Sequence, residues 1–433
     1  MANPVTNPAV ESKRILGYSR WWQVLAAAVM MALVSPYQYV WSSIEGPLAV
    51  DLNASLSALG FVFTAYVVIM ALVQFPAGWW RDRYGPRAVT LAAGVLAGGG
   101  YVALAFSTSI WQVYLAYSIG AAGVGMVYTV AVNTAIKWFP DRRGLTTGIG
   151  TMAFAAGSAA FVPYVRWMVA DGALATALSS MGLLIALGIV VGTVILRDPP
   201  ENWLRDAQKP VEDGTASSEA STPAEGDDQP DHAPDGGSWR KQFTWREMVR
   251  TWQFWVMYFM FFAVSAAGLM ITARVVLYAE ESALTATTAT VAATLLPIAS
   301  GGGRLIVGGL SDRFDRERIT AASFLVCGIG TVGVVVFAGV GSGAGYILAV
   351  AVAVFFWSSQ FSLFPSLVGD YYGAKHSSAN YSLVYSGKMW GGVFGGGVVG
   401  WLVGIVGWDT TFLLGGALAL AAGVAGLVLR RPQ

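Results

Sequence analysis

Long apolar stretches alternate with short polar loops along the whole chain. Twelve of these stretches are long enough to cross about 30 Å of hydrocarbon at about 1.5 Å per helical residue. They cover residues 22–44, 58–80, 88–107, 110–135, 145–168, 175–196, 252–278, 285–310, 319–340, 344–366, 380–404 and 408–429. This pattern predicts an all-α integral membrane protein with twelve transmembrane helices.

A polar stretch, residues 197–250, divides the predicted spans into two sets of six. Its central part, Val211 to Ser238, is rich in Asp, Glu, Pro, Gly and Ser and contains no Lys or Arg. A segment of this composition cannot bury a core, so we interpret it as a disordered linker. The predicted organisation is an N-terminal six-helix half (1–196), an acidic linker (197–250) and a C-terminal six-helix half (251–433).

Composition supports a membrane protein and narrows its chemistry. The chain is 55% hydrophobic and 12% charged, whereas soluble domains have about 25% charged residues. A net charge of +1 gives no indication of a nucleic-acid partner, and a single cysteine excludes a disulfide framework. Since no HExxH, GxSxG or Walker motif is present, we expect neither an enzyme nor a bound metal or cofactor.

The distribution of cations predicts the orientation of the chain in the membrane. Of the 26 Lys and Arg residues, four lie elsewhere (Arg166, Arg274, Arg304 and Lys388), and the other 22 fall on one face if the N-terminus is cytoplasmic. Basic residues are enriched in cytoplasmic loops. We therefore expect a multi-pass protein of the plasma membrane with both termini and the linker in the cytoplasm.

A short charged loop motif occurs once in each half. "GWWRDRYGPR" follows the second span, and "GGLSDRFDRER" follows the eighth. Their Asp-Arg pairs are 230 positions apart, the difference between 312 and 82. A repeated six-span unit is typical of secondary transporters, which bind substrate between the repeats. The candidate gating residues are Gly78, Asp82, Arg83, Gly85 and Arg87 in the first copy and Asp312 and Arg313 in the second.

The first copy resembles the G-x-x-x-D-R-x-G-x-R loop of the major facilitator superfamily. The second copy has Asp315 where a glycine is usual. The resemblance covers all twelve predicted spans and implies two pseudo-symmetric halves around a central cavity. It also implies that the loops favour one state of the transporter; the alternative is that their Arg residues only set the topology.

Three cations lie within predicted spans: Arg274, Arg304 and Lys388. Each costs about 2.5 to 3.5 kcal/mol on insertion scales. We expect no Asp or Glu deep in a span, since Glu45 and Glu280 fall at outer ends. The presence of these cations is therefore best explained by a mobile counter-ion that binds between them. We accordingly predict that the substrate is an anion. Arg274 also has a structural alternative, because it is near enough to Glu280 to pair locally.

Aromatic and amide side chains accompany these cations in the first, fourth, tenth and eleventh spans. Aromatic rings narrow a cavity, while Tyr hydroxyls, Trp indoles and amides supply directed hydrogen bonds. The predicted lining consists of Gln38, Tyr39, Tyr128, Trp357 and Tyr385.

Four segments resemble the oxalate:formate antiporter group, which neighbours the monocarboxylate transporters: "GAAGVGMVYTVAVNTAIKWFPDRRGLTTG", "SGGGRLIVGGLSDR", "FSLFPSLVGDYYG" and "SGKMWGGVFGGG". The resemblance implies that Arg304 and Lys388 grip a dianion. It also places Gln38, Tyr39, Tyr128 and Trp357 in the cavity lining. Two departures concern specificity, because Phe361 replaces an expected tyrosine and Arg274 an expected asparagine.

Three functional classes follow from these observations. The favoured one is anion:anion antiport of small mono- or dicarboxylates by a monomer embedded in the lipid bilayer. The second is a proton-coupled monocarboxylate symporter. The resemblance implies that such symporters have an aspartate one helical turn before the arginine of the eighth span, whereas this chain has Ser300 there. The third is a non-transporting sensor built on a transporter scaffold. The intact loop motif "GWWRDRYGPR" argues against this third class.

Overall fold

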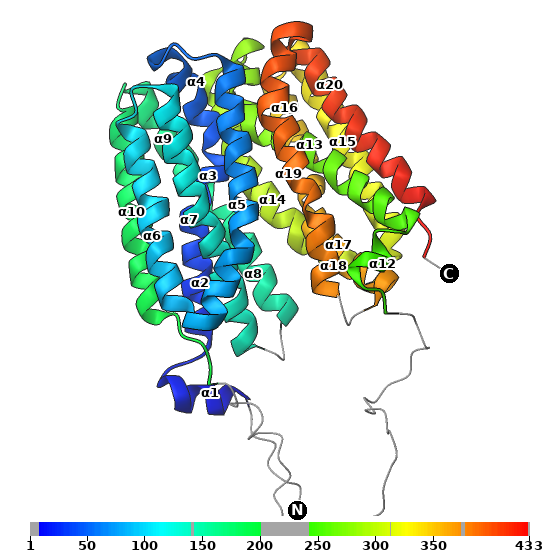
Figure 1. Cartoon of the computed structure of the whole chain (residues 1–433). Helices are drawn as coiled ribbons and strands as arrows, with labels where there is room; N and C mark the ends of the chain where they lie inside the picture. The colour runs from blue at the N-terminus through cyan, green and yellow to red at the C-terminus, as the bar shows by residue number, and fades with distance from the viewer. Residues whose placement is uncertain (1–7, 140–142, 201–241, 312, 374–376, 432–433) are drawn as a thin grey trace, which may run out of the picture.

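The computed structural model describes residues 8–139, 143–200, 242–311, 313–373 and 377–431, and their regular structure is helical throughout. Figure 1 shows the helices before the linker on one side of the bundle and those after it on the other. The core of the predicted linker, residues 201–241, lies outside the described part of the chain.

The first half contains six spans, of which the first and fifth are interrupted. The first span comprises α2, α3 and α4, and the fifth comprises α8, η1 and α9. The helices are α1 (Pro8–Leu16), α2 (Trp21–Val34), α3 (Pro36–Tyr39), α4 (Trp41–Asp51), α5 (Leu56–Tyr84), α6 (Pro86–Ala105), α7 (Ile110–Trp138), α8 (Arg143–Ala156), η1 (Gly157–Ala159), α9 (Phe161–Ala170) and α10 (Leu174–Ile195).

The second half also contains six spans, which follow the short helix α12. Its tenth span comprises α16 and α17, and its eleventh comprises α18, α19, the π-helical segment η2 and the start of α20. The helices are α12 (Trp245–Met248), α13 (Trp252–Glu281), α14 (Ala286–Ser311), α15 (Arg316–Gly339), α16 (Gly343–Ser358), α17 (Gln360–Tyr372), α18 (Ser377–Tyr385), α19 (Gly387–Val393), η2 (Phe394–Val398) and α20 (Val399–Val428).

The helices account for the twelve predicted spans. Ten continuous helical stretches of the described chain are long and apolar enough to cross a membrane, and the bent helices from Trp21 to Asp51 add an eleventh. The stretch Leu383–Val428 has 46 residues, about 69 Å at 1.5 Å per residue. The chain turns within it at Gly407, where φ is 81°. Counting this stretch as two spans gives twelve, so the predicted fold class is confirmed.

Glycines bring the two halves into close contact along α5 and the eleventh span. A methyl group added at Gly396 would collide with the carbonyl oxygen of Gly60 and lie 2.5 Å from Oγ1 of Thr64. One added at Gly392 would lie 2.7 Å from Val67. The glycines of the eleventh span therefore form a close-packing face, and its partner is α5 of the other half.

Candidate functional site

Arg304 lies in α14, at the contact between the two halves. Its side chain is buried, with 6% exposed. One guanidinium nitrogen, Nη1, donates a hydrogen bond of 2.9 Å to the carbonyl oxygen of Thr151 in α8 of the first half. Its Cζ lies 4.5 Å from the ring centre of Phe361, and its Nε has no hydrogen-bond partner.

Lys388 approaches the same ring from the eleventh span. It is 4% exposed, and its Nζ lies 5.3 Å from the ring centre of Phe361 and 5.8 Å from that of Tyr385. The ammonium donates a long hydrogen bond of 3.4 Å to Oε1 of Gln38 in the first half. The two cations therefore share one aromatic neighbour, and each also reaches across to the opposite half.

The two cations lack a carboxylate counter-ion within the part of the chain that the structure describes. No described Asp or Glu oxygen lies within 4.0 Å of Arg304 or Lys388. Cation–π contacts contribute about 0.5 to 2 kcal/mol each but leave the positive charge in place. Because buried unpaired charge is costly, the arrangement favours an anion that enters between the cations.

Tyr39 and Tyr128 lie on the first-half side of the site. The Tyr39 hydroxyl hydrogen-bonds to Ser300 of α14 at 3.0 Å, so this contact also joins the halves. The rings of Tyr39 and Tyr128 lie 6.3 and 5.6 Å from that of Phe154. Ser300 is the residue at the position where the proton-coupled transporters were expected to have an aspartate.

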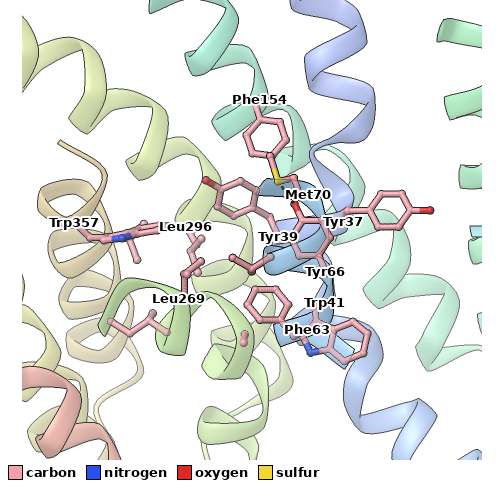
Figure 2. Close-up of a cluster of buried hydrophobic side chains, with 14 of the residues drawn as sticks. Tyr37, Tyr39, Trp41, Phe63, Tyr66, Met70, Phe154, Leu269, Leu296 and Trp357 are labelled. Atoms are coloured by element: carbon pink, nitrogen blue, oxygen red, sulfur yellow. Dashed lines mark hydrogen bonds between the residues drawn. The ribbon is translucent and has the colours of Figure 1, made fainter. Parts of the chain in front are cut away.

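Trp357 and Tyr385 lie on the second-half side. Their ring centres are 5.9 and 6.0 Å from Phe361. Figure 2 shows Trp357 and Leu296 on one side of the interface and Tyr39 on the other. The predicted lining residues thus come together around the two cations.

Unused hydrogen-bond donors are a second feature of this region. Nε2 of Gln38, Nε1 of Trp357 and Nε of Arg304 are buried without a partner. Buried polar groups are nearly always hydrogen-bonded, so each exception needs an explanation. Here all three are donors, and a ligand rich in acceptor oxygens would satisfy them.

From the sequence, Phe361 was notable only as a departure from an expected tyrosine. In the structure both cations lie over the ring of Phe361 and form cation–π contacts with it. Phe361 lies four residues after Trp357, across the junction at Ser359, and the two ring centres are 5.9 Å apart. This spacing could have indicated that the two rings lie close together. The carbonyl of Thr151 gave no such signal, because any residue type supplies one.

Arg274 differs from the other two cations, because a carboxylate of the protein balances its charge. It forms an ion pair with Glu45, and both side chains are 0% exposed. A buried carboxylate is therefore present, contrary to expectation. Glu280, the local partner considered as an alternative, pairs with Arg166 at 3.0 Å. Because Glu45 balances the charge of Arg274 within the protein, we do not include Arg274 in the proposed anion site.

The first predicted gating loop is short and joins two helices directly. Gly78 lies within α5, and Gly85 ends that helix with φ of 79°, a conformation that favours glycine. Arg83 and Arg87 are exposed. The side chain of Asp82 lies outside what the structure describes.

A partner of this loop was not predicted from the sequence. Arg81, which is 1% exposed, donates to Asp198 at 2.8 Å and to Thr134 at 3.3 Å. Lys137 pairs with the same carboxylate at 2.8 Å. Asp198 directly follows the sixth span, so these contacts tie the ends of three spans together within the first half.

In the second loop, Asp312 lies outside the described residues and Arg313 is exposed. Asp315, which departs from the family pattern, caps α15 by accepting a hydrogen bond of 3.0 Å from the backbone N–H of Arg318. This bond lowers the pKa of the Asp315 carboxyl. The departure from glycine thus has a structural consequence at the start of a helix.

In the described part of the chain no group of three or more His, Cys, Asp or Glu side chains comes together to hold a metal ion. The chemistry available at the site is that of fixed cations, hydrogen-bond donors and aromatic walls. Such groups bind and orient an anion without changing its covalent bonds.

Comparisons with known proteins agree with this description. A family model for the Major Facilitator Superfamily matches residues 23–395. The oxalate:formate antiporter of Oxalobacter formigenes is 30% identical over 417 residues, covering 96% of this chain and 91% of that protein. Monocarboxylate transporter 13 of Rattus norvegicus is 28% identical over 116 residues, or 27% of each chain. A crystal structure of a D-xylose-proton symporter matches with a TM-score of 0.72, 13% identity and coverage of 95% and 98%.

Proposed function

Because the chain belongs to the Major Facilitator Superfamily of membrane transporters, we propose that it exchanges small carboxylate anions across the plasma membrane by alternating access. The proposed substrates are mono- and dicarboxylates of the size of formate and oxalate. The similarity to an oxalate:formate antiporter over nearly the whole chain supports this class. In this proposal both termini and the linker are cytoplasmic, and the loops containing Asp82 and Asp312 influence which side is open.

The observation that carries the proposal is the unmatched charge at the site. Arg304 and Lys388 contact the ring of Phe361, and neither forms an ion pair with an Asp or Glu that the structure describes. A planar guanidinium suits two oxygens of one carboxylate, and an ammonium adds a point charge for a second. Gln38 and Trp357 add buried donors that the protein leaves unused.

The same charges give a physical reason for exchange. The contacts of Arg304 with Thr151 and of Lys388 with Gln38 both join the two halves. When the site is empty, movement of the two halves breaks these hydrogen bonds of Arg304 and Lys388. No anion is then present to balance the two positive charges. A bound anion compensates them, so the loaded protein changes state more easily than the empty one. Return of the protein is then coupled to a second anion.

A proton-coupled symporter of monocarboxylates is the second candidate. The partial similarity to a monocarboxylate transporter and the buried carboxylate of Glu45 favour it. The position one turn before Arg304 argues against it, because Ser300 there cannot carry a proton in the physiological range.

Counterflow in proteoliposomes tests the proposal. Vesicles containing purified protein are loaded with one unlabelled carboxylate, and uptake of a labelled one is followed with no pH gradient. We expect accumulation of label that depends on the internal anion. Uptake that requires an inward proton gradient and ignores the internal anion would support the symporter instead.

Substitution of the two cations links this activity to the site. Arg304→Gln and Lys388→Gln are each expected to reduce counterflow by roughly 100-fold or more, since loss of a charged contact to a buried anion costs about 3 kcal/mol or more. Arg250→Gln, which removes an exposed cytoplasmic cation, is the matched control and should retain full rate. Near-normal exchange by Arg304→Gln, with normal membrane insertion, would contradict the proposed site.

A further inference from the structure

The ion pair between Glu45 and Arg274 joins the two halves of the protein. Glu45 lies in α4 of the first half and Arg274 in α13 of the second, and both are fully buried. The guanidinium also donates hydrogen bonds to the carbonyl oxygens of Leu56 at 3.0 Å and Gly396 at 3.3 Å. One side chain therefore connects α13 to α4, to the start of α5 and to η2.

This pair lies between the anion site and one end of the bundle. α3 carries Gln38 and Tyr39 of the site, and α4 continues from it to the end of the bundle that lies away from both termini (Figure 1). The close contact of Gly60 with Gly396 lies beside Arg274, because a methyl group on Gly60 would touch both. Glycine contacts and the ion pair thus close the same end.

Among the ion pairs in which the structure describes both partners, those that join the halves lie at one end. At the end away from the termini, a second pair joins the halves: Arg166 of α9 with Glu280 of α13, whose side chains are 12% and 45% exposed. Near the opposite end, the ion pairs between described residues stay within one half. They are Arg14–Glu11, Arg81–Asp198, Lys137–Asp198, Arg316–Asp370 and Arg431–Glu317.

The two ion pairs that join the halves differ in burial, and burial determines how strongly each holds the halves together. A partly exposed pair such as Arg166–Glu280 is screened by water and contributes less. Removing one partner of a fully buried pair leaves an uncompensated charge in a dry interface, which strongly disfavours that arrangement. If the halves part at this end, water reaches both charges and hydrates them separately.

We infer that Glu45 and Arg274 hold the outer end of the transporter closed, and that their separation is required for the outward-open state. Arg274 is thus a positioning residue for the conformational change, distinct from the cations that bind substrate. The inference rests on the alternating-access part of the proposed function and is independent of which solute is carried.

Cysteine labelling tests this directly. The test replaces Ser57 by cysteine in a Cys327→Ser background that removes the native cysteine. Ser57 belongs to the contact between the halves, because its Cα would lie 2.8 Å from a methyl group added at Gly400. Labelling by a membrane-impermeant maleimide is then timed in intact cells. Glu45→Gln is expected to raise the labelling rate about tenfold, which corresponds to a modest shift in a two-state equilibrium. Glu280→Gln, the matched control at the exposed pair, should change it less than twofold.

A double variant protects the test against misfolding. Glu45→Gln with Arg274→Gln removes both charges and leaves neither uncompensated, so it should insert normally and also label faster than the parent. Parental labelling rates in both Glu45→Gln and the double variant would overturn the inference. Labelling is measured without substrate, so it reports on this end of the protein even if the carboxylate proposal fails in counterflow.

Discussion

At the residue scale, the site is organised around Phe361. Its ring lies within 5.3 Å of both cationic groups and offers them an aromatic face without neutralising them. A carboxylate in the same place would satisfy the cations and compete with an incoming anion. The apolar ring therefore keeps the positive charge available, while its lack of a hydroxyl removes one donor that the antiporter resemblance led us to expect.

Phe361→Tyr should shift the preference of the site toward dicarboxylates. The added hydroxyl supplies a hydrogen bond beside both cations, and such a bond to a charged group contributes about 1.5 kcal/mol, or roughly tenfold in affinity. The measurement is the ratio of oxalate to formate concentrations that half-inhibit counterflow.

Phe361→Leu is the control for this substitution, because it removes the ring without adding a hydroxyl. If Phe361→Leu and Phe361→Tyr change the oxalate to formate ratio equally, the hydroxyl has no specific role, and the argument from the resemblance is wrong.

At the element scale, the site residues cluster at interruptions in the spans. Gln38 and Tyr39 lie in the four-residue helix α3, Trp357 and Phe361 flank the junction of α16 and α17, and Lys388 follows the junction of α18 and α19. Discontinuous spans are typical of transporter binding sites, because backbone freed from helical hydrogen bonds can line a cavity and can bend.

Gly396→Ala tests the close contact between η2 and α5. The new methyl group would collide with the backbone of Gly60, and overpacking of this kind costs about 1 to 3 kcal/mol. We expect a lower melting temperature in detergent and at least a tenfold loss of counterflow. Gly404→Ala, at a position with no atom within 4 Å of the added carbon, should behave as the parent. Equal behaviour of the two variants would show that the contact is not required.

At the scale of the whole molecule, the two halves touch through polar contacts at the site and through the buried ion pair beyond it. Arg304, Lys388, Tyr39 and Arg274 each bond to the opposite half. These four contacts between the halves therefore belong to residues of the proposed anion site and of the buried ion pair.

Deletion of Glu212 to Gly236 should leave transport intact. This acidic segment is expected to contribute no core and only to join the halves, and the remaining polar residues still provide a flexible connection. Counterflow within twofold of the parent is the expected result. A large loss, with the deleted protein still present in the membrane, would assign the segment a role beyond that of a tether.

The sequence by itself determined the spans, their number and the candidate cations. Crossing hydrocarbon requires about twenty apolar residues in a row, so Arg304 and Lys388 were conspicuous in their spans. Such signals are local and need no knowledge of neighbours.

Only the tertiary structure decided which charges are balanced. Glu45 and Arg274 are 229 positions apart (274 minus 45) and meet because α4 and α13 pack together across the halves. Likewise, Phe361 became central because three spans converge on its ring. Electrostatic partnership depends on distance in space and on exclusion of water, and a linear sequence specifies neither until the helices have packed.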